Sequence, residues 1–287
     1  MRTIGELSRQ GESPLVKMWT IGVSRGRRPF VRHSHTQFEI AAVNEGEGEY
    51  TTENAVYPMM PGDVFVFSSN EVHYITGVDR ELSITNLQFE PRFLIESGTE
   101  RYGLNFCFFH SPGFKNRIPA AAAAVQQEYH RGIREELLKR ETGYADAIKA
   151  YLKLMAIDLV RRHDYQTNDP GHNGGAIFDM ASVYNYIEDH FSEEIRLKDV
   201  AEIAALSPNY FSHAFKKLNG ISLWEYITAK RVEKAARLIA EQKNAATLLE
   251  IATQCGFNNT VNFNKAFKRQ KGITPGELKK NTKLLSD

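Results

Sequence analysis

The C-terminal part of the chain concentrates positive charge. Between Phe263 and Lys283 a single acidic residue, Glu277, stands among basic side chains, which are Lys265, Lys268, Arg269, Lys271, Lys279, Lys280 and Lys283. Residues 1–180 contain 20 Lys and Arg and 23 Asp and Glu, whereas residues 181–287 contain 16 and 12, so the two parts carry net charges of −3 and +4. Cationic groups at this density suit a phosphate backbone. A basic helix can equally be a solvated face, so charge alone does not establish nucleic-acid binding.

A second group of polar side chains lies near the N-terminus. His33, His35, Gln37 and Glu39 occupy alternate positions, so on a β-strand they point to one face, while Phe38 points to the other. Polar groups that face an interior need hydrogen-bonding partners and can receive a small polar molecule. We expect Asn44, Asn86 and Gln88 to face the same interior. The full set of expected small-molecule contacts, with Arg32 at the entrance, is Arg32, His33, His35, Glu39, Asn44, His73, Asn86 and Gln88.

The composition is that of a globular protein with a substantial core. The chain has 287 residues, of which 42% are hydrophobic and 25% are charged, and this length indicates about two domains. No segment approaches the ~20 apolar residues of a membrane span, and the N-terminus lacks the pattern of a signal peptide. We therefore expect a cytoplasmic protein without membrane contacts. Cys107 and Cys255 lie in segments of different character, which favours buried thiols over a disulfide and leaves no cysteine-based zinc site.

The first half of the chain predicts strands followed by two helices. In residues 14–92 apolar and polar positions alternate between turn-rich segments, at the spacing of a sandwich or small barrel. Residues 119–163 predict two amphipathic helices in a hairpin that packs on the barrel or on a second subunit. Residues 166–178 have the composition of a linker. We therefore assign residues 1–165 to the first domain and residues 179–287 to the second.

The second domain repeats itself. Residues 214–222 match residues 266–274 at a spacing of 52, and Val200-Ala201 corresponds to Ile251-Ala252. This pattern indicates a duplication. Each copy predicts a helix-turn-helix, at residues 197–218 and 247–270, with a small residue where the helices cross, a tight turn and two core phenylalanines four residues apart.

Helix limits are also visible in the second domain. Ser207-Pro208 predicts a helix start, and Ser222 with Glu225 and Thr274 with Glu277 predict capping boxes. Glycines at 220 and 272 are expected to close the two second helices of the motifs. The apolar stripe of residues 223–241 predicts a stiff helix that connects the motifs.

These motifs resemble the AraC/XylS family of bacterial transcription regulators. The resemblance is strongest at Ile251-Ala-x-x-Cys-Gly-Phe257, Asn262-x-x-Lys265-x-Phe267-Lys268 and Gly272-Ile-Thr-Pro275, and it spans roughly Tyr184 to Lys280. In the family, the second helix of each motif enters the major groove. The resemblance therefore implies a set of base-reading residues, which are Asn209, Ser212, His213, Thr260, Val261, Asn262, Asn264 and Lys265. It also implies phosphate contacts from Lys216, Lys217, Lys268 and Arg269.

The chemistry of these side chains fits base recognition. Lys265 can donate to guanine, Asn262 or Asn264 can pair with adenine, and Val261 can contact a thymine methyl. In the first motif Ser212 and His213 are short or weakly charged. We therefore expect the second motif to be the stronger base reader.

The N-terminal polar residues resemble the two motifs of the cupin barrel. The matching residues are His33-x-His35-x₃-Glu39-x₆-Gly46, then Pro61-Gly62-Asp63 and His73. In metal-containing cupins the corresponding residues bind the metal, so the resemblance implies a divalent metal at His33, His35, Glu39 and His73. In AraC-type regulators such a barrel usually serves as an effector pocket without metal. We expect no cofactor and keep a divalent metal as the alternative.

The sequence thus predicts an N-terminal all-β cupin-like barrel with a helical hairpin and a C-terminal all-α domain with two helix-turn-helix motifs. We expect a ligand-responsive transcription regulator, without catalytic residues, that binds a double-stranded operator as a homodimer. Its effector is a small molecule such as a sugar, and an activator would also contact RNA polymerase. One alternative is a metal-dependent cupin enzyme fused to a DNA-binding tail. Another is a constitutive DNA-binding protein whose barrel only supports dimerisation.

Overall fold

The computed structural model describes residues 2–8, 14–24, 31–78, 81–94, 108–110, 114–163, 165–167, 179–219, 221–241 and 246–284. The chain forms two compact units. The N-terminal unit comprises Met1–Phe30 and Gln37–Ile177, and the C-terminal unit comprises Val31–Thr36 and Phe178–Asp287. Of the predicted linker, Gln166 and Thr167 lie in a strand, and residues 168–178 are outside the described ranges. The sequence did not predict that Val31–Thr36 would join the C-terminal unit.

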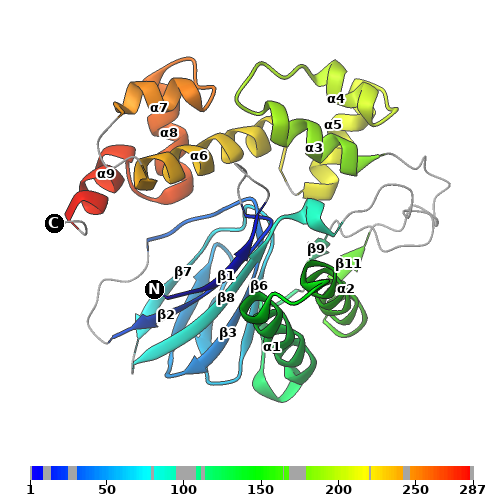
Figure 1. Cartoon of the computed structure of the whole chain (residues 1–287), viewed down its shortest axis with the longest axis vertical. Helices are drawn as coiled ribbons and strands as arrows, with labels where there is room; N and C mark the ends of the chain where they lie inside the picture. The colour runs from blue at the N-terminus through cyan, green and yellow to red at the C-terminus, as the bar shows by residue number, and fades with distance from the viewer. Residues whose placement is uncertain are drawn as a thin grey trace. The chain divides into compact units, whose positions relative to one another are not determined.

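The described part of the N-terminal unit is built on antiparallel sheets, as expected (Figure 1). A large sheet has the strand order β1-β2-β8-β3-β6-β10, a smaller sheet has the order β5-β4-β7, and β11 pairs with β9. The strands are β1 (Arg2–Leu7), β2 (Val16–Val23), β3 (Phe38–Glu45), β4 (Gly48–Thr52), β5 (Val56–Met59), β6 (Val64–Phe67), β7 (His73–Val78), β8 (Leu82–Phe89), β9 (Phe108–His110), β10 (Arg117–Ile118) and β11 (Tyr165–Thr167).

The two faces of the large sheet serve two different cores. In β8, Leu82 and Ile84 belong to an inner core that includes Phe65 and Phe67. Leu87, on the opposite face, belongs to an outer core shared with the helical hairpin. Because successive side chains of a strand point to opposite faces, a two-residue period assigns each position to one core or the other.

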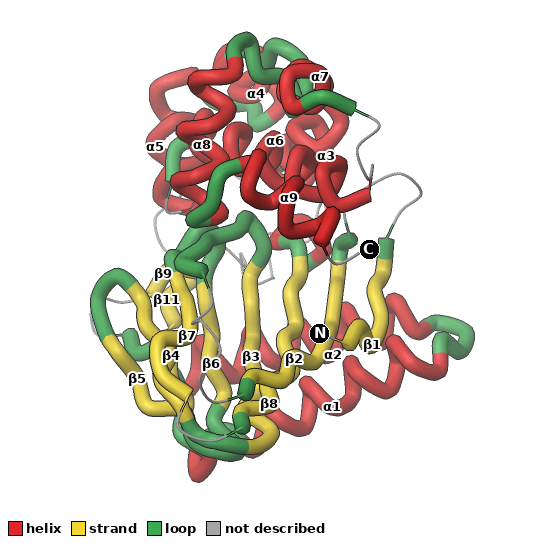
Figure 2. The backbone as a smooth tube through the Cα atoms, turned by 90° about the vertical axis from the view of Figure 1, so that its left-hand side faces the viewer, coloured by secondary structure: helices red, strands yellow, loops and turns green. Residues whose placement is uncertain are grey.

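The hairpin consists of α1 (Ala124–Lys139) and α2 (Tyr144–Arg162), and it covers the outer face of the large sheet (Figure 2). Gly143, at φ +83°, makes the turn into α2. A buried polar contact fixes the pairing of the helices, because the side-chain amide of Gln126 donates to the Met155 carbonyl oxygen at 3.0 Å and to the Asp158 carboxylate at 2.9 Å. Short 3-10 turns occupy Pro91–Phe93 and Ala120–Ala122.

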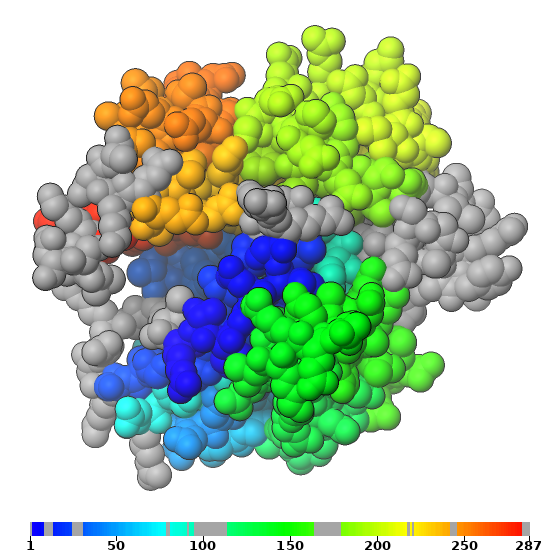
Figure 3. Space-filling model, in the orientation of Figure 1, coloured from blue at the N-terminus to red at the C-terminus, as the bar shows by residue number. Residues whose placement is uncertain are grey.

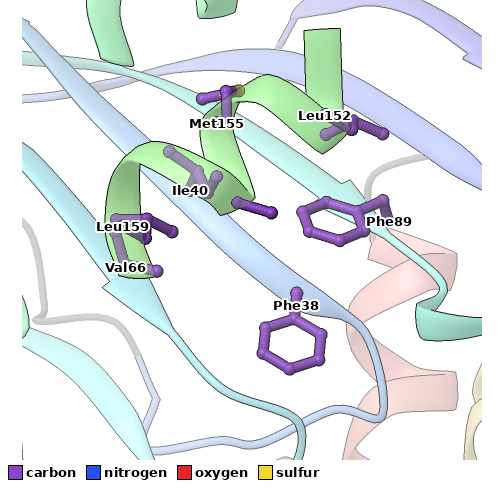
Figure 4. Close-up of a pocket in the computed structure, with 8 residues that line it drawn as sticks. Phe38, Ile40, Val66, Phe89, Leu152, Met155 and Leu159 are labelled. Atoms are coloured by element: carbon purple, nitrogen blue, oxygen red, sulfur yellow. The ribbon is translucent and has the colours of Figure 1, made fainter. Parts of the chain in front are cut away.

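A small apolar cavity lies between the large sheet and α2 (Figure 4). Its volume is about 10 Å³, and its lining consists of Phe38, Ile40, Val66, Phe89, Leu152, Met155, Ala156 and Leu159. A space of this size is about that of one water molecule. It is therefore a packing gap and not a site for a metabolite.

The C-terminal unit is helical in its described part (Figure 1). Among the described residues, none of the helices combines the length and apolar character that crossing a bilayer requires. The helices are α3 (Met180–His190), α4 (Leu197–Ile203), α5 (Pro208–Asn219), α6 (Leu223–Glu241), α7 (Leu248–Gln254), α8 (Thr260–Lys271) and α9 (Pro275–Leu284). Helices α4 and α5 form the first helix-turn-helix and α7 and α8 the second, within one or two residues of the predicted limits.

Aromatic pairs join each motif to the connecting helix α6. In the first motif Phe215 contacts Phe211 and, from α6, Tyr226, with ring centroids 5.6 Å apart in both cases. In the second motif Phe263 and Phe267 are buried in a core with Val232 of α6. The predicted connecting helix therefore forms, and both motifs pack on it.

Side chains cap the helices where the sequence predicted it. At the start of α6, Ser222 and Glu225 exchange hydrogen bonds as a capping box, and Thr274 and Glu277 do so at the start of α9. A further capping box at Thr247 and Glu250 begins α7. That box follows the same S/T-x-x-E pattern, which the sequence analysis had not used at this position.

The turns of the two motifs share a hydrogen-bond pattern but differ in residue type. The Leu206 N–H donates to the Ala201 carbonyl oxygen at 2.9 Å, and the Phe257 N–H donates to that of Ala252 at 3.0 Å. The residue before each donor has a left-handed conformation, with φ +55° at Ala205 and +83° at Gly256. Glycine adopts this conformation without strain, whereas an L-residue with a Cβ does not.

We therefore expect Ala205→Gly to stabilise the protein by about 0.5–1 kcal/mol, because the relief of left-handed strain exceeds the entropy that glycine adds to the unfolded chain. Gly256→Ala should destabilise it by about 2 kcal/mol or more, since the new Cβ would also lie 2.5 Å from the Ser192 carbonyl oxygen. Urea unfolding measures both. Ala204→Gly, at φ −77°, is the control and should not stabilise. An Ala205→Gly protein less stable than the parent would contradict the explanation.

Candidate DNA-binding surface and candidate ligand site

Helix α5 exposes the predicted base-reading residues of the first motif. Phe211 and Phe215 are fully buried, which directs the opposite side of the helix to solvent. The described residues on that side are Asn209, His213 and Lys216, which are exposed, and Ser212, which is half-buried. The side chain of Lys217 lies outside the described part of the structure.

Helix α8 presents a longer exposed face. Its N-cap, Asn259, accepts a hydrogen bond from the Asn262 backbone N–H at 2.7 Å. Val261 is 59% exposed, an apolar surface that a thymine methyl can cover. The other predicted contacts are Asn262, Asn264, Lys265, Lys268 and Arg269, all exposed, and Thr260, which is half-buried.

The two asparagines of α8 differ in their readiness to pair with adenine. The Asn264 side-chain amide donates to the Thr260 carbonyl oxygen of its own helix at 2.8 Å. A bidentate contact needs both the amide N–H and the amide oxygen, so Asn264 must rotate before it can read a base in that way. Asn262 lies two residues closer to the N-terminus of α8 and is the better placed of the two.

Tyr210 was missed by the sequence analysis. It is the third residue of α5, as Asn262 is of α8, and its backbone N–H also faces an N-cap side chain, with 3.4 Å to Ser207 Oγ. Tyr210 is 51% exposed, so its ring and hydroxyl can reach a groove or a phosphate. The 52-residue repeat pairs Tyr210 with Asn262, and that spacing is the signal that identifies it.

Basic side chains from both motifs lie near the capping carboxylate of α6. Hydrogen bonds from Ser222 lower the pKa of Glu225, and the charges of Arg269 and Lys216 lower it further. Lys216 belongs to α5 and Arg269 to α8. One predicted phosphate contact from each motif therefore acts electrostatically on the same carboxylate.

In the N-terminal unit, several polar side chains meet on the inner face of the large sheet. Strand register places Gln88 of β8 between Lys17 of β2 and Glu39 of β3. Two residues before Gln88 in β8, and on the same face of the sheet, Asn86 pairs with Trp19 of β2. Together with His73 of the small sheet, these residues form what we call the inner polar site, made of Lys17, Trp19, Glu39, His73, Asn86 and Gln88.

Glu39 is the buried charge of the inner polar site. Its side chain is 3% exposed, and its Oε2 accepts a hydrogen bond from Gln88 Nε2 at 2.7 Å and lies 3.9 Å from His73 Nε2. His73 stacks on Phe67, with ring centroids 4.1 Å apart. Burial lowers the pKa of His73, but the interaction with the Glu39 carboxylate and, to a lesser extent, with Glu71 outweighs burial and leaves that pKa raised. Burial, and then the charge of Glu39, raises the pKa of Tyr50.

Asn86 and Trp19 provide the inner polar site with groups that a ligand could contact. Asn86 is 4% exposed, and its Oδ1 has no hydrogen-bond partner among the described residues. Lys17 Nζ lies 5.8 Å from the centre of the Trp19 ring. A buried acceptor without a donor carries a desolvation cost that a ligand hydroxyl can remove. Lys17 and Trp19 were missed by the sequence analysis, although they alternate with Ile21 along β2.

Asn44 does not face the interior, and this part of the sequence prediction was wrong. Its side-chain amide donates to Ser83 Oγ at 3.2 Å and to Thr85 Oγ1 at 3.0 Å. Counting by twos along β3, Asn44 shares a face with Phe38 and Ile40, which pack in the outer core. Glu39, Asn86 and Gln88 do share the inner face, so the error comes from the parity of a single position.

Arg32, His33 and His35 lie outside the strand on which they were expected. Strand β3 begins at Phe38, so alternation does not extend back to His33. The His33 and His35 rings lie 5.9 Å apart at 47°, and His33 Nδ1 is 2.9 Å from the Val31 carbonyl oxygen. These residues belong to the C-terminal unit. Of the four metal ligands that the cupin resemblance implied, the N-terminal unit therefore supplies Glu39 and His73.

Comparison with known proteins agrees with this geometry. Residues 24–141 match the family "AraC-like ligand binding domain", and residues 200–281 match the family "Helix-turn-helix domain". The chain is 25% identical over 244 residues to the probable transcriptional regulator LumQ of Photobacterium leiognathi, covering 85% of this chain and 89% of that protein. It is 23% identical over 256 residues to the HTH-type transcriptional activator RhaS of Pectobacterium atrosepticum, covering 87% of this chain and 88% of that protein.

The fold is also found in solved structures. ToxT from Vibrio cholerae superposes with a TM-score of 0.58 at 13% identity, covering 92% of this chain and 97% of that chain. A ToxT structure with a bound unsaturated fatty acid gives a TM-score of 0.54 at 14% identity, covering 92% and 94%. The two family matches and the named relatives, together with the surfaces described above, define a two-domain transcription regulator with a ligand-binding N-terminal domain and a DNA-binding C-terminal domain. The chain belongs to the AraC family of transcription regulators.

The exposed face of α8 predicts which contacts carry sequence information. We expect Lys265→Ala to weaken binding to a duplex selected from random DNA by about 5- to 150-fold, because a base contact is lost, and to affect unselected DNA less. Lys268→Ala should weaken both duplexes by a similar factor and reduce the salt dependence of binding. Fluorescence anisotropy over a salt series measures both effects. Equal losses on both duplexes for Lys265→Ala would remove it from the base readers.

Proposed function

We propose that this regulator binds a small polyhydroxylated molecule, a sugar or polyol, at the inner polar site, and that this ligand controls its binding to operator DNA. The observation that carries the proposal is the buried Asn86 Oδ1, which has no hydrogen-bond partner among the described residues and lies opposite Trp19 in the sheet. The inner core next to the site is filled by side chains such as Phe65 and Phe67. A ligand is therefore expected at the polar end of the barrel.

The chemistry of the inner polar site suits hydroxyl groups, which both donate and accept hydrogen bonds. Glu39 and Asn86 offer acceptor oxygens, while Lys17 and Gln88 offer N–H donors. The face of Trp19 offers apolar area against which the C–H side of a sugar ring can pack. A mainly apolar pocket with a few converging polar groups is the usual form of a metabolite site.

The remaining parts of the proposal follow from the DNA-binding unit. The regulator recognises a double-stranded operator through α5 and α8, acts in the cytoplasm, and contacts RNA polymerase where it activates. Its curated relatives are named as transcription regulators and activators, which supports a role without catalysis or a cofactor.

The ligand proposal predicts the behaviour of Asn86→Leu. Leucine has a similar volume and removes the buried acceptor, so we expect the protein to become more stable by about 1 kcal/mol while its affinity for the sugar or polyol falls about 10-fold. Glu39→Gln should weaken ligand binding by about 10- to 100-fold, because a charged acceptor is lost. Calorimetric titration with a panel of pentoses, hexoses and polyols measures binding, and thermal unfolding measures stability.

Asn44→Ala is the matched control, because Asn44 is exposed on the opposite face, and it should leave ligand affinity unchanged. Fatty acids and other carboxylic acids complete the panel. Binding of an acid, with no sugar or polyol bound at millimolar concentration, would refute the proposed ligand class.

We also propose that two copies associate through the α1–α2 hairpin. On it, Leu138 and Leu154 expose 58% and 42% of their surface, and burying such side chains favours association. Leu154→Lys should shift a dimer towards the monomer in sedimentation-velocity runs at micromolar concentration. Lys153→Leu is the charge control and should not dissociate it. A chain that sediments as a monomer before mutation would refute this interface.

A further inference from the structure

The segment Val31–Thr36 is held by the DNA-binding unit although its sequence lies between two strands of the barrel. The Ser34 N–H donates to the Gln270 carbonyl oxygen, in the last turn of α8, at 2.9 Å. The Thr36 N–H donates to Glu233 Oε1 at 2.6 Å, and the Thr36 hydroxyl donates to Glu233 Oε2 at 2.8 Å. Thr36 has no exposed surface. The contact therefore consists of buried, charge-assisted hydrogen bonds, which are stronger than hydrogen bonds between neutral groups.

Glu233 is suited to hold such a segment. Burial raises the pKa of Glu233, but the charges of Lys230 and Lys271 and the hydrogen bonds from Thr36 outweigh burial and leave that pKa lowered. The carboxylate therefore stays ionised near neutral pH. Of the groups that stabilise this carboxylate, Lys271 belongs to the end of α8 and Thr36 belongs to the segment. The charge of Glu233 therefore interacts with both the segment and the second recognition helix.

The end of α8 is shaped to admit the segment. Gly272 closes α8 in the left-handed conformation, at φ +71°. A Cβ at this position would collide with the Arg32 carbonyl oxygen and the Val31 side chain. Glycine is therefore required at position 272 for two reasons, which are the left-handed backbone conformation and the close approach of the segment.

Only a few residues of chain connect this contact to the inner polar site. The change from one unit to the other falls at the Thr36–Gln37 peptide bond, and the Gln37 side chain donates to Glu90 Oε1 at 2.7 Å within the N-terminal unit. Glu39 follows two residues later. Three residues span at most about 10 Å, so Thr36 of the docked segment and Glu39 of the inner polar site are joined by a short stretch of chain.

We infer that the surface formed by Glu233, Gln270 and Gly272 is a docking site for the chain's own residues 31–36, and that this segment couples occupancy of the inner polar site to the position of α8. The inference rests on the proposed function, since it specifies how the ligand would act. It has a consequence that needs no ligand. Coupling between two sites is reciprocal, so binding of DNA to α8 must alter the inner polar site.

Trp19 reports on this coupling. The chain has two tryptophans, and replacing the exposed Trp224 of α6 by Phe leaves Trp19 of the inner polar site as the sole indole. In a Trp224→Phe background, titration with a duplex selected from random DNA by the full-length protein should change the Trp19 emission. Thr36→Val removes one hydrogen bond to Glu233 at constant volume, which weakens docking by about 10- to 100-fold. The Trp19 response at saturating duplex should then fall at least about threefold.

Thr51→Val is the matched control, because the Thr51 hydroxyl bonds to Thr76 on the small sheet, and it should keep the full response. Glu233→Gln is a second variant that weakens both bonds, and thermal unfolding checks that each variant is folded. An unchanged Trp19 response in folded Thr36→Val and Glu233→Gln, or no response in the parent, would overturn the inference. The titration contains no sugar, so the inference can succeed where the proposed ligand class fails, and the reverse.

Discussion

The pairing of β3 with β8 is the constraint on which the N-terminal unit depends. It runs from Phe38 opposite Phe89 to Glu45 opposite Ser83, and it separates two environments residue by residue. Phe38 and Phe89 go to the helices, whereas Glu39 and Gln88 go to the inner polar site. A slip of one residue would exchange the faces. The register that directs apolar side chains towards the hairpin therefore also places the Glu39 carboxylate in the inner polar site.

In the C-terminal unit the main constraint is the separation of the two recognition helices, α5 and α8. Helix α6 has 19 residues and is about 28 Å long, close to the ~34 Å between successive major grooves on one face of DNA. Each motif attaches to it through buried phenylalanines, Phe215 at one end and Phe263 with Phe267 at the other. The duplication thus supplies two similar readers, and the connecting helix supplies their spacing.

Local rules predicted much of this from the sequence. The capping boxes at Ser222 and Thr274, the paired phenylalanines and the alternation in β8 depend on residues a few positions apart, and these features are confirmed. The failures have separate causes. Asn44 lies five positions after Glu39 in β3, and an odd separation puts two side chains of a strand on opposite faces, so alternation was misapplied at this position. Val31–Thr36 was assigned to the barrel because nothing within it reveals that Glu233, 197 residues further along from Thr36, accepts its hydrogen bonds.

The buried amide oxygen of Asn86 also bears on how long the regulator survives in a cell. A folded chain that lacks a donor for this oxygen carries an uncompensated cost, and a ligand that supplies one adds RT ln(1 + [L]/Kd) to the stability, about 2.7 kcal/mol at 100 times Kd. Proteases degrade the unfolded fraction, so such a gain lowers turnover. In the ligand-controlled regulator proposed above, the signal would therefore set the abundance of its own receptor, in addition to the affinity of that receptor for DNA.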